Sequence, residues 1–131
     1  MGRAPDTIGE LMSNDVVTVG PNDRVRDALQ AMIDHDFGSV VVVEDDRPVG
    51  MFTERDVTRH VLSDVALLDE RVGDLMSKPP ITVQPGDQVV DVFELMNGKG
   101  IRRLPVVDGD RLVGIVTEGD LRRWVGQVAK E

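Results

Sequence analysis

The chain contains 131 residues and carries a formal net charge of −9, with no cysteine, three phenylalanines, one tryptophan and no tyrosine. This length suits one ordinary domain or two small halves that share a core. The lack of cysteine excludes disulfides and thiolate metal sites. The acidic balance and the scarcity of aromatic side chains argue against binding to nucleic acid.

The amino-acid pattern indicates neither a membrane span nor a targeting signal. The longest clean apolar run is Val40–Val43, far short of the roughly 20 residues with which a helix crosses a bilayer. Residues 1–6 lack the apolar core of a signal peptide. We therefore expect a cytoplasmic protein that makes no use of a membrane, with residues 1–6 as a disordered lead-in.

In the first half, apolar periodicity and turn residues predict helices and strands in alternation. Thr7-Ile8-Gly9-Glu10 fits a capping box at the start of a short helix, and Gly20-Pro21 ends a short strand. The run Ser39–Val43 is typical of a strand that is buried on both faces. The expected elements are a helix over 7–12, a strand over 16–19, a helix capped by Asn22 or Asp23 with Val25, Leu29, Met32 and Ile33 inward, strands over 39–43 and 49–52, and a helix from Thr53 to about Leu62.

The second half repeats this order after an unmatched stretch, residues 63–70, which we interpret as a linker. Asp108-Gly109 between its last two strands is a hairpin signal. The expected elements are a helix over 72–76, a strand over 81–83, a helix over 87–96 with Val89, Val92, Phe93 and Met96 inward, a break at 97–100, strands over 103–107 and 112–116, and a helix from Thr117 to about Val128.

The repetition extends to individual residues. The octet Val49–Asp56 recurs as Val113–Asp120, and residues 8–61 align with 72–125 without a gap. An ungapped internal repeat of this length predicts two copies of one supersecondary unit. Neither copy can cover its own sheet well. We therefore expect an α/β (α+β) fold in which two β-α-β-β-α repeats, 7–62 and 71–126, are joined by the linker 63–70 and pack about a pseudo-two-fold axis.

The repeated Thr-x-x-Asp motif has two interpretations that the sequence leaves open. Thr53-x-x-Asp56 and Thr117-x-x-Asp120 each follow a strand and open a helix. The simpler interpretation is a helix N-cap, in which the threonine accepts from a first-turn amide. The same place also offers free amides to an anion, and a carboxylate there suits a ribose diol, as in dinucleotide-binding folds. Gly50 and Gly114 would admit either a ligand or a neighbouring backbone.

Arginines lie near both motifs and could bind phosphate, although surface exposure is the common state of arginine. They are Arg55 inside the first motif, Arg102 and Arg103 before the strand of the second, and Arg59 and Arg123 one turn past each aspartate. Residues 1–64 carry 13 acids and 6 bases, a net charge of −7, and residues 65–131 carry 11 and 9, a net charge of −2. We therefore expect the two sites to be unequal.

Other kinds of chemistry lack support in the sequence. His35 and His60 occupy unrelated positions of the repeat, so we expect no metal site and no histidine base. Ser13 and Ser77 are expected to cap or turn the backbone. There is no phosphate-binding loop, no Gly-x-Ser-x-Gly and no cysteine nucleophile. We expect no catalytic residue, and the chain is not predicted to be an enzyme.

Taken together, these motifs resemble the cystathionine-β-synthase (CBS) domain. The resemblance rests on Leu-Met-Ser, Val-Thr-Val-x-Pro, an amphipathic helix, Arg-Leu-Pro-Val-Val-Asp and Gly-Ile-Val-Thr-x-x-Asp, and it covers residues 7–126. The first copy is the looser one, because Ser39–Val42 stands where the second copy has Arg103–Val106. The chain looks like one tandem CBS pair, or Bateman module.

The resemblance implies an adenosyl ligand, namely AMP, ADP or ATP, with S-adenosylmethionine and NAD as further candidates, bound in two clefts between the repeats. The aspartates would hold ribose hydroxyls, and the threonines of the motifs would contact ribose or phosphate. Thr18 and Thr82 would border the adenine, with Met51 and Ile115 near its face. The candidate site residues are Thr18, Met51, Thr53, Arg55, Asp56, Thr82, Arg103, Ile115, Thr117 and Asp120.

The family resemblance also implies a biological role. Such modules commonly form homodimers and regulate an enzyme or transporter. We expect a nucleotide sensor that signals to a partner which the sequence does not identify, with no catalysis. The alternative is a ligand-free dimerisation module in which both Thr-x-x-Asp motifs are only helix caps.

Overall fold

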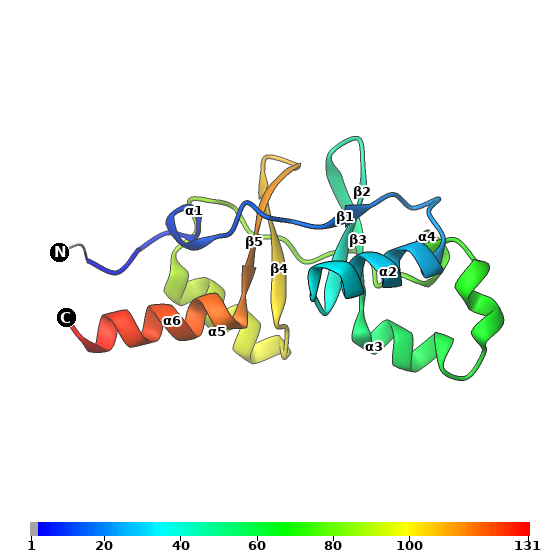
Figure 1. Cartoon of the computed structure of the whole chain (residues 1–131). Coiled ribbons are helices and arrows are strands. Elements are labelled where there is room, and N and C mark those ends of the chain that lie inside the picture. The colour runs from blue at the N-terminus through cyan, green and yellow to red at the C-terminus, as the bar shows by residue number, and fades with distance from the viewer. Residues whose placement is uncertain (1–2) are drawn as a thin grey trace. The chain divides into compact units, whose positions relative to one another are not determined.

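The computed structural model describes residues 3–131, which form a mixed α/β fold (Figure 1). The fold consists of two compact units. The first, called the 16–80 unit, comprises Val16–Pro80. The second, called the 81–131 unit, comprises Ile81–Glu131 together with the chain up to Asp15. The mixed α/β class predicted from the repeat is confirmed, and each unit is described separately.

The 16–80 unit is built on a three-stranded sheet in the order β1-β2-β3. Strand β1 runs parallel to β2, and β2 pairs with β3 in an antiparallel hairpin. Beyond β3, Met51 forms a further bridge with Ser77. The elements are β1 (Thr18–Val19), α2 (Val25–His35), β2 (Ser39–Glu44), β3 (Arg47–Thr53), α3 (Glu54–Asp56), a π-helical turn η1 (Val57–Val61), a 3-10 helix η2 (Val65–Asp69) and α4 (Val72–Leu75).

The core of this unit forms because alternate side chains of a strand point to opposite faces of the sheet. Val40 lies opposite Phe52 in the hairpin, and these two side chains share one buried cluster. Helix α2 covers this face. The cluster comprises Val25, Ala28, Met32, Val40, Val42, Phe52, Val61 and Val72.

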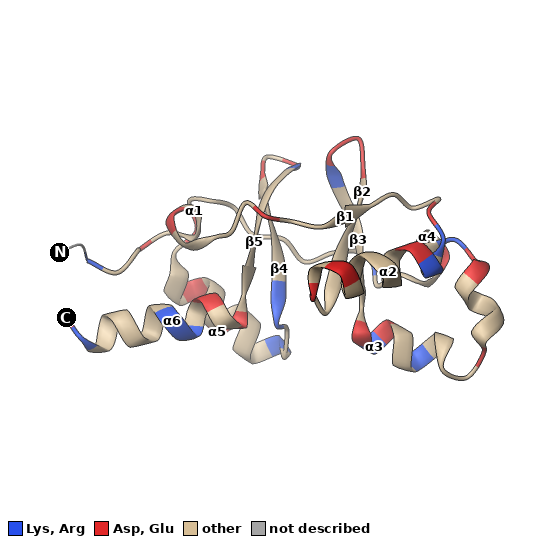
Figure 2. Ribbon diagram, viewed as in Figure 1, with Lys and Arg blue, Asp and Glu red and all other residues tan. Residues whose placement is uncertain are grey.

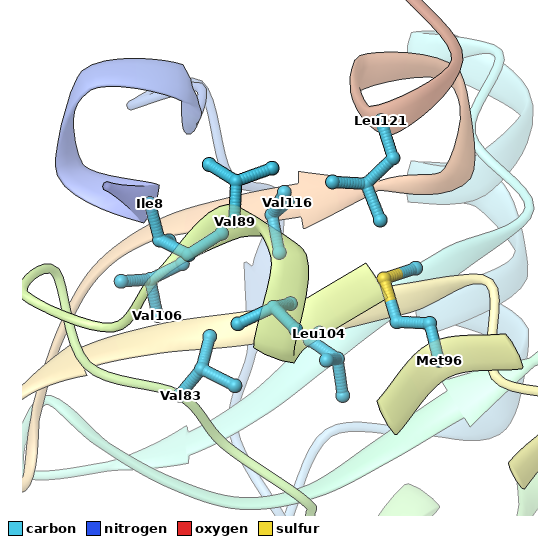
Figure 3. Close-up of a cluster of buried hydrophobic side chains, with 9 residues drawn as sticks. Ile8, Val83, Val89, Met96, Leu104, Val106, Val116 and Leu121 are labelled. Carbon is cyan, nitrogen blue, oxygen red and sulfur yellow. The ribbon is translucent and has the colours of Figure 1, made fainter. Parts of the chain in front are cut away.

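The 81–131 unit repeats this plan with a two-stranded sheet, in which Leu104 of β4 lies opposite Val116 of β5. Its elements are α1 (Ile8–Leu11), α5 (Val89–Lys99), β4 (Arg103–Asp108), β5 (Arg111–Thr117) and α6 (Glu118–Ala129). Side chains from both strands and from α1, α5 and α6 meet in its core (Figure 3). The cluster comprises Ile8, Val83, Val89, Val92, Met96, Leu104, Val106, Val116 and Leu121.

The predicted strand over 81–83 is reduced to a single parallel bridge between Val83 and Val106. In the 16–80 unit, the backbone N–H of Val41 donates to the carbonyl of Val17 at 3.1 Å and extends the pairing. The corresponding residue of β4 is Pro105, which has no N–H to donate. One proline therefore explains why the second sheet lacks the third strand that the first sheet has.

Each short lead-in helix lies in the unit formed mainly by the other repeat. The amides of Ile8 and Gly9 donate to the carbonyls of Asp87 and Pro85, at 2.9 and 2.8 Å. The second lead-in does the same in the 16–80 unit, where the amides of Val72 and Gly73 donate to Asp23 and Pro21, at 2.7 and 2.9 Å. The compact units and the contiguous repeats 7–62 and 71–126 thus differ in these helices.

Each of these helices makes its close approach at a glycine. A Cβ atom on Gly73 would lie 2.8 Å from the carbonyl oxygen of Pro21, and one on Gly9 would lie 3.2 Å from that of Pro85. The predicted capping box at Thr7 is wrong for a related reason. The neighbouring backbone already satisfies the first amides of α1, and the Thr7 hydroxyl donates to Glu10 Oε1 at 3.0 Å instead.

Several local expectations are also wrong. Asp23 does not cap α2, because its Oδ2 accepts from the Gly20 amide at 2.8 Å and closes a turn. Ile33 is 71% exposed, since the buried face of α2 centres on Val25, Ala28 and Met32. Phe93 on α5 is 38% exposed, although it was expected to face inward.

Two predicted irregular segments are ordered where the structure describes them. Helix α5 continues through Gly98 and Lys99 and ends only at Gly100, which takes the left-handed conformation with φ 65°. Residues 3–6 are not a disordered lead-in. The Ala4 amide donates to Glu131, and the indole N–H of Trp124 in α6 donates to the carbonyl of Pro5. Residues 1–2 lie outside the described part.

Candidate functional site

The first Thr-x-x-Asp motif is a complete capping box at the junction of β3 and α3. Asp56 is only 2% exposed. Its Oδ2 accepts from the backbone amide and the hydroxyl of Thr53, at 2.9 and 3.1 Å, and the Thr53 hydroxyl accepts from the Asp56 amide at 3.4 Å. The cap prediction for Thr53 is therefore confirmed. The junction holds a buried carboxylate at a fixed position.

The second oxygen of this carboxylate contacts another segment of the unit. Ser77 lies just past α4 and donates its hydroxyl to Asp56 Oδ1 at 2.8 Å. It is held there by a backbone bridge with Met51, with N–O distances of 3.0 and 2.8 Å. A Cβ atom on Gly50 would lie 2.9 Å from the Ser77 carbonyl oxygen. Gly50 thus admits a neighbouring backbone, one of the two interpretations that the sequence left open.

The second motif has the same cap in the 81–131 unit, at the junction of β5 and α6. Asp120 Oδ2 accepts from the amide and the hydroxyl of Thr117, at 2.9 and 3.0 Å. Asp120 is 7% exposed. Acidic residues mark the first turn of α3 and of α6 (Figure 2). Each unit therefore holds one buried carboxylate in the same local frame.

The two carboxylates differ in the partner of their second oxygen. Asp120 Oδ1 accepts from Nη2 of Arg123, one turn further along α6. Ser13 corresponds to Ser77 and has the same backbone bridge, with Ile115, but its hydroxyl accepts from the Asp15 amide at 3.1 Å. Ser13 thus turns the backbone, as expected. Asp56 faces a neutral hydroxyl, whereas Asp120 faces a guanidinium.

The remaining predicted site residues differ in how far they are buried and in where they lie on the sheets and helices. Met51 and Ile115 are half-buried beside the bridging serines. Arg103, also half-buried, begins β4 opposite Thr117. Thr18 is exposed on β1, and β2 separates it from β3 and from the Thr53–Asp56 junction. The exposed side chains of Arg55 on α3 and of Thr82 just before the bridge at Val83 complete the set.

Two serines belong to the first site although the sequence did not assign them to it. Ser77 contacts Asp56 directly, and its repeated Leu-Met-Ser setting was the available signal. Ser39 begins β2 opposite Thr53, is 5% exposed, and within residues 3–131 carries a buried hydroxyl that lacks a hydrogen-bond partner. Its counterpart in the second repeat is Arg103. No sequence pattern marked this buried hydroxyl.

Each of the two junctions presents a carboxylate at a fixed position. A fixed carboxylate with one oxygen facing a replaceable side-chain donor can accept hydrogen bonds from a diol.

Within residues 3–131, no three His, Cys, Asp or Glu side chains group as metal ligands. His35 instead stacks on Phe37, with ring centroids 6.1 Å apart. No helix in this described range is both long and apolar enough for a membrane span.

Comparison with known proteins gives matches over most of the chain. The family model described as "CBS domain" matches residues 8–63 and again 72–127. An uncharacterized protein of Methanopyrus kandleri is 42% identical over 118 residues, which cover 88% of this chain and 60% of that protein.

Two solved structures show the same fold with ligands bound. CBSX2 in complex with AMP has a TM-score of 0.85 and 28% identity, covering 95% of this chain and 99% of that one. The CBS domain pair of protein MJ0100, in complex with 5′-methylthioadenosine and S-adenosyl-L-methionine, has a TM-score of 0.83 and 26% identity, covering 97% and 100%.

Proposed function

Because this chain belongs to the CBS-domain family, we propose that it is a regulatory module that binds an adenosine nucleotide and does not transform it chemically. The supporting observation is the pair of buried aspartates, Asp56 and Asp120, each fixed by a capping box at the start of a helix. The AMP complex of CBSX2 and the two adenosyl ligands of MJ0100 belong to proteins of similar fold.

Each unit would contribute one ribose-binding carboxylate. The capping box occupies Oδ2 of each aspartate, so a ribose hydroxyl would bind Oδ1 and replace the side-chain donor now there. In the 16–80 unit, Thr53 and the buried hydroxyl of Ser39 would add polar contacts. In the 81–131 unit, Thr117 and Arg103 would take these positions. AMP, ADP and ATP are the proposed ligands, with S-adenosylmethionine and NAD as further candidates.

A second candidate function also has an observation in its favour. Both carboxylates already have donors on both oxygens, which is what a purely structural cap requires. Ile33, Leu62 and Val65 are each at least 70% exposed in the 16–80 unit, and exposed apolar side chains suit an interface between proteins. This candidate is a ligand-free dimerisation module that interacts with a partner through its surface.

Isothermal titration with AMP, ADP, ATP, S-adenosylmethionine and NAD separates the two. The sensor predicts saturable heat with at least one ligand. It also predicts that Asp56→Ala and Asp120→Ala each abolish one binding event and that the double variant binds nothing. Each substitution should reduce the binding free energy at its own site by roughly 1.5–3 kcal/mol, which is the value of hydrogen bonds to a charged group. Asp91→Ala, an exposed acid on α5, is the charge-matched control.

The outcome depends on folded variants, because loss of a cap costs about 1 kcal/mol. Circular dichroism should therefore show native helix content before each titration. Wild-type protein that gives no heat with any of the five ligands would support the dimerisation module. Folded single variants that titrate like wild type would show that the aspartates are only caps.

A further inference from the structure

The two carboxylates meet different side chains, and this difference suggests different ligand preferences. Asp56 Oδ1 receives a neutral hydroxyl from Ser77. Asp120 Oδ1 receives the guanidinium of Arg123. Arg59 is the residue of the first repeat that corresponds to Arg123. Within residues 3–131, however, the donor to Asp56 Oδ1 is Ser77 and not Arg59. The charged partner is thus a property of the second site.

The residue beside this contact is Gly119. A Cβ atom on Gly119 would lie 3.7 Å from Arg123 Nη1 and 3.6 Å from Thr117 Oγ1. The guanidinium therefore lies over the first turn of α6, against the place where a longer side chain would begin. The first repeat has Arg55 at this position. The two repeats thus differ in the residue that precedes the buried aspartate.

The surroundings of the two sites also differ in charge. We compare the same seven repeat positions, at the start of the second strand and in the first turns of the following helix. In the 81–131 unit they are Arg102, Arg103, Glu118, Gly119, Asp120, Arg122 and Arg123, four positive and two negative, a net charge of +2. In the 16–80 unit they are Gly38, Ser39, Glu54, Arg55, Asp56, Thr58 and Arg59, two positive and two negative, a net charge of 0.

The pair between Arg123 and Asp120 can exchange partners at low cost. The Arg123 side chain is 71% exposed, whereas that of Asp120 is 10% exposed. A released guanidinium regains water, but the buried carboxylate needs another donor in its place. Ribose hydroxyls are such donors. A 5′-phosphate is carried on the same sugar ring, and a guanidinium binds phosphate through two parallel hydrogen bonds.

We infer that the Asp120 site selects phosphorylated adenosine ligands through Arg123, which leaves Asp120 for the ligand's phosphate when ribose hydroxyls replace it. Arg123 is thus a specificity-determining residue. The Asp56 site, with a neutral donor, discriminates less between a nucleotide and an uncharged nucleoside. This inference rests on the proposed function, since it concerns the same carboxylates.

The test compares AMP with adenosine, which differ only in the phosphate. Amide resonances of isotopically labelled protein report each site separately, through Gly119 for one and Arg55 for the other. Wild type should bind AMP about tenfold more tightly than adenosine at the Asp120 site, the value of one charge-assisted hydrogen bond. Arg123→Gln should remove this preference and leave the adenosine affinity equal or higher. Arg59→Gln, the matched control, should change the preference at neither site.

The possible results separate the two proposals. A wild type that binds both ligands, combined with an Arg123→Gln variant that keeps the AMP preference, overturns the role of Arg123 and leaves the proposed function standing. A wild type in which neither ligand shifts any amide overturns both. Arg123 is exposed, so the amide spectrum should confirm that the variant stays folded. Arg123→Lys, which keeps the charge without the planar fork, should retain part of the preference.

Discussion

The close approach of two backbones at Gly50 can be tested directly with Gly50→Ala. The added Cβ atom would lie 2.4 and 2.8 Å from Sδ and Cγ of Met76 and 2.9 Å from the carbonyl oxygen of Ser77. The Met76 side chain is flexible and can move. The Ser77 carbonyl cannot move alone, because it accepts from the Met51 amide at 3.0 Å while the Ser77 amide donates back at 2.8 Å.

The expected cost follows from this geometry. Overpacking of a well-packed site costs about 1–3 kcal/mol, so we expect the free energy of unfolding to fall by about 2 kcal/mol. For a chain of this size that is a decrease in Tm of roughly 6–10 °C. Ser77 is the donor that a ribose hydroxyl would replace on Asp56 Oδ1, so the loss of stability should not be accompanied by a loss of ligand affinity at the Asp56 site.

Urea denaturation followed by circular dichroism measures this cost, and Gly126→Ala is the matched control. Gly126 lies inside α6, and a Cβ atom there would meet nothing within 4 Å. Alanine is favoured over glycine in a helix by up to about 1 kcal/mol, so the control should be more stable than wild type. If the free energy of unfolding of the Gly50→Ala protein lies within about 0.3 kcal/mol of the wild-type value, far below the expected cost of overpacking, the two backbones do not approach each other closely at Gly50.

Three further predictions concern the caps, ligand-linked stability and assembly. Thr117→Val should lower the free energy of unfolding, measured by urea denaturation, by about 1 kcal/mol through loss of the cap. Thr7→Val, at a helix without a side-chain cap, should lower it by less than half of that. Equal losses in the two variants would contradict the assignment of Thr117 as a cap and Thr7 as uncapped. AMP at about 100 times its dissociation constant should stabilise the protein by roughly 2.7 kcal/mol, and a melting curve unchanged in millimolar AMP would leave only very weak binding. Light scattering should give a homodimer of twice 14.4 kDa, because the apolar side chains exposed on both units suit an interface; a monomer at tens of micromolar, roughly where a weak biological interface would already associate, would count against it.

The sequence by itself determined the features that depend on neighbouring residues. The ungapped repeat predicted two similar units, and the Val49–Asp56 octet and its copy predicted the strand, cap and helix at each junction. These predictions hold because a capping box links residues only three positions apart. The buried run from Ser39 was equally visible, since a strand with both faces covered needs apolar residues at successive positions.

Features that depend on a distant partner could not be predicted in this way. The strand expected over 81–83 requires an N–H from β4, which Pro105 lacks. Thr7 resembles a cap in sequence, but the Gly9 amide donates to the carbonyl of Pro85 and the Glu10 amide donates to the carbonyl of Thr7, so neither binds the Thr7 hydroxyl. The segment 81–83 and Thr7 both had the local pattern of the predicted element, but contacts with residues far along the chain decided what each of them forms.

Only the tertiary structure decided which lead-in helix enters which unit. Pro21 and Asp23 recur as Pro85 and Asp87, so both repeats offer the same carbonyls to a lead-in helix. The local sequence therefore cannot distinguish the two pairings, because the contacts in each would be equivalent. The same arrangement brings Ser77 to Asp56, whereas Asp120 takes its second donor, Arg123, from its own helix. The Ser77 partner of Asp56, and with it the proposed difference in ligand preference, depends on packing between segments 21 positions apart, which no local motif encodes.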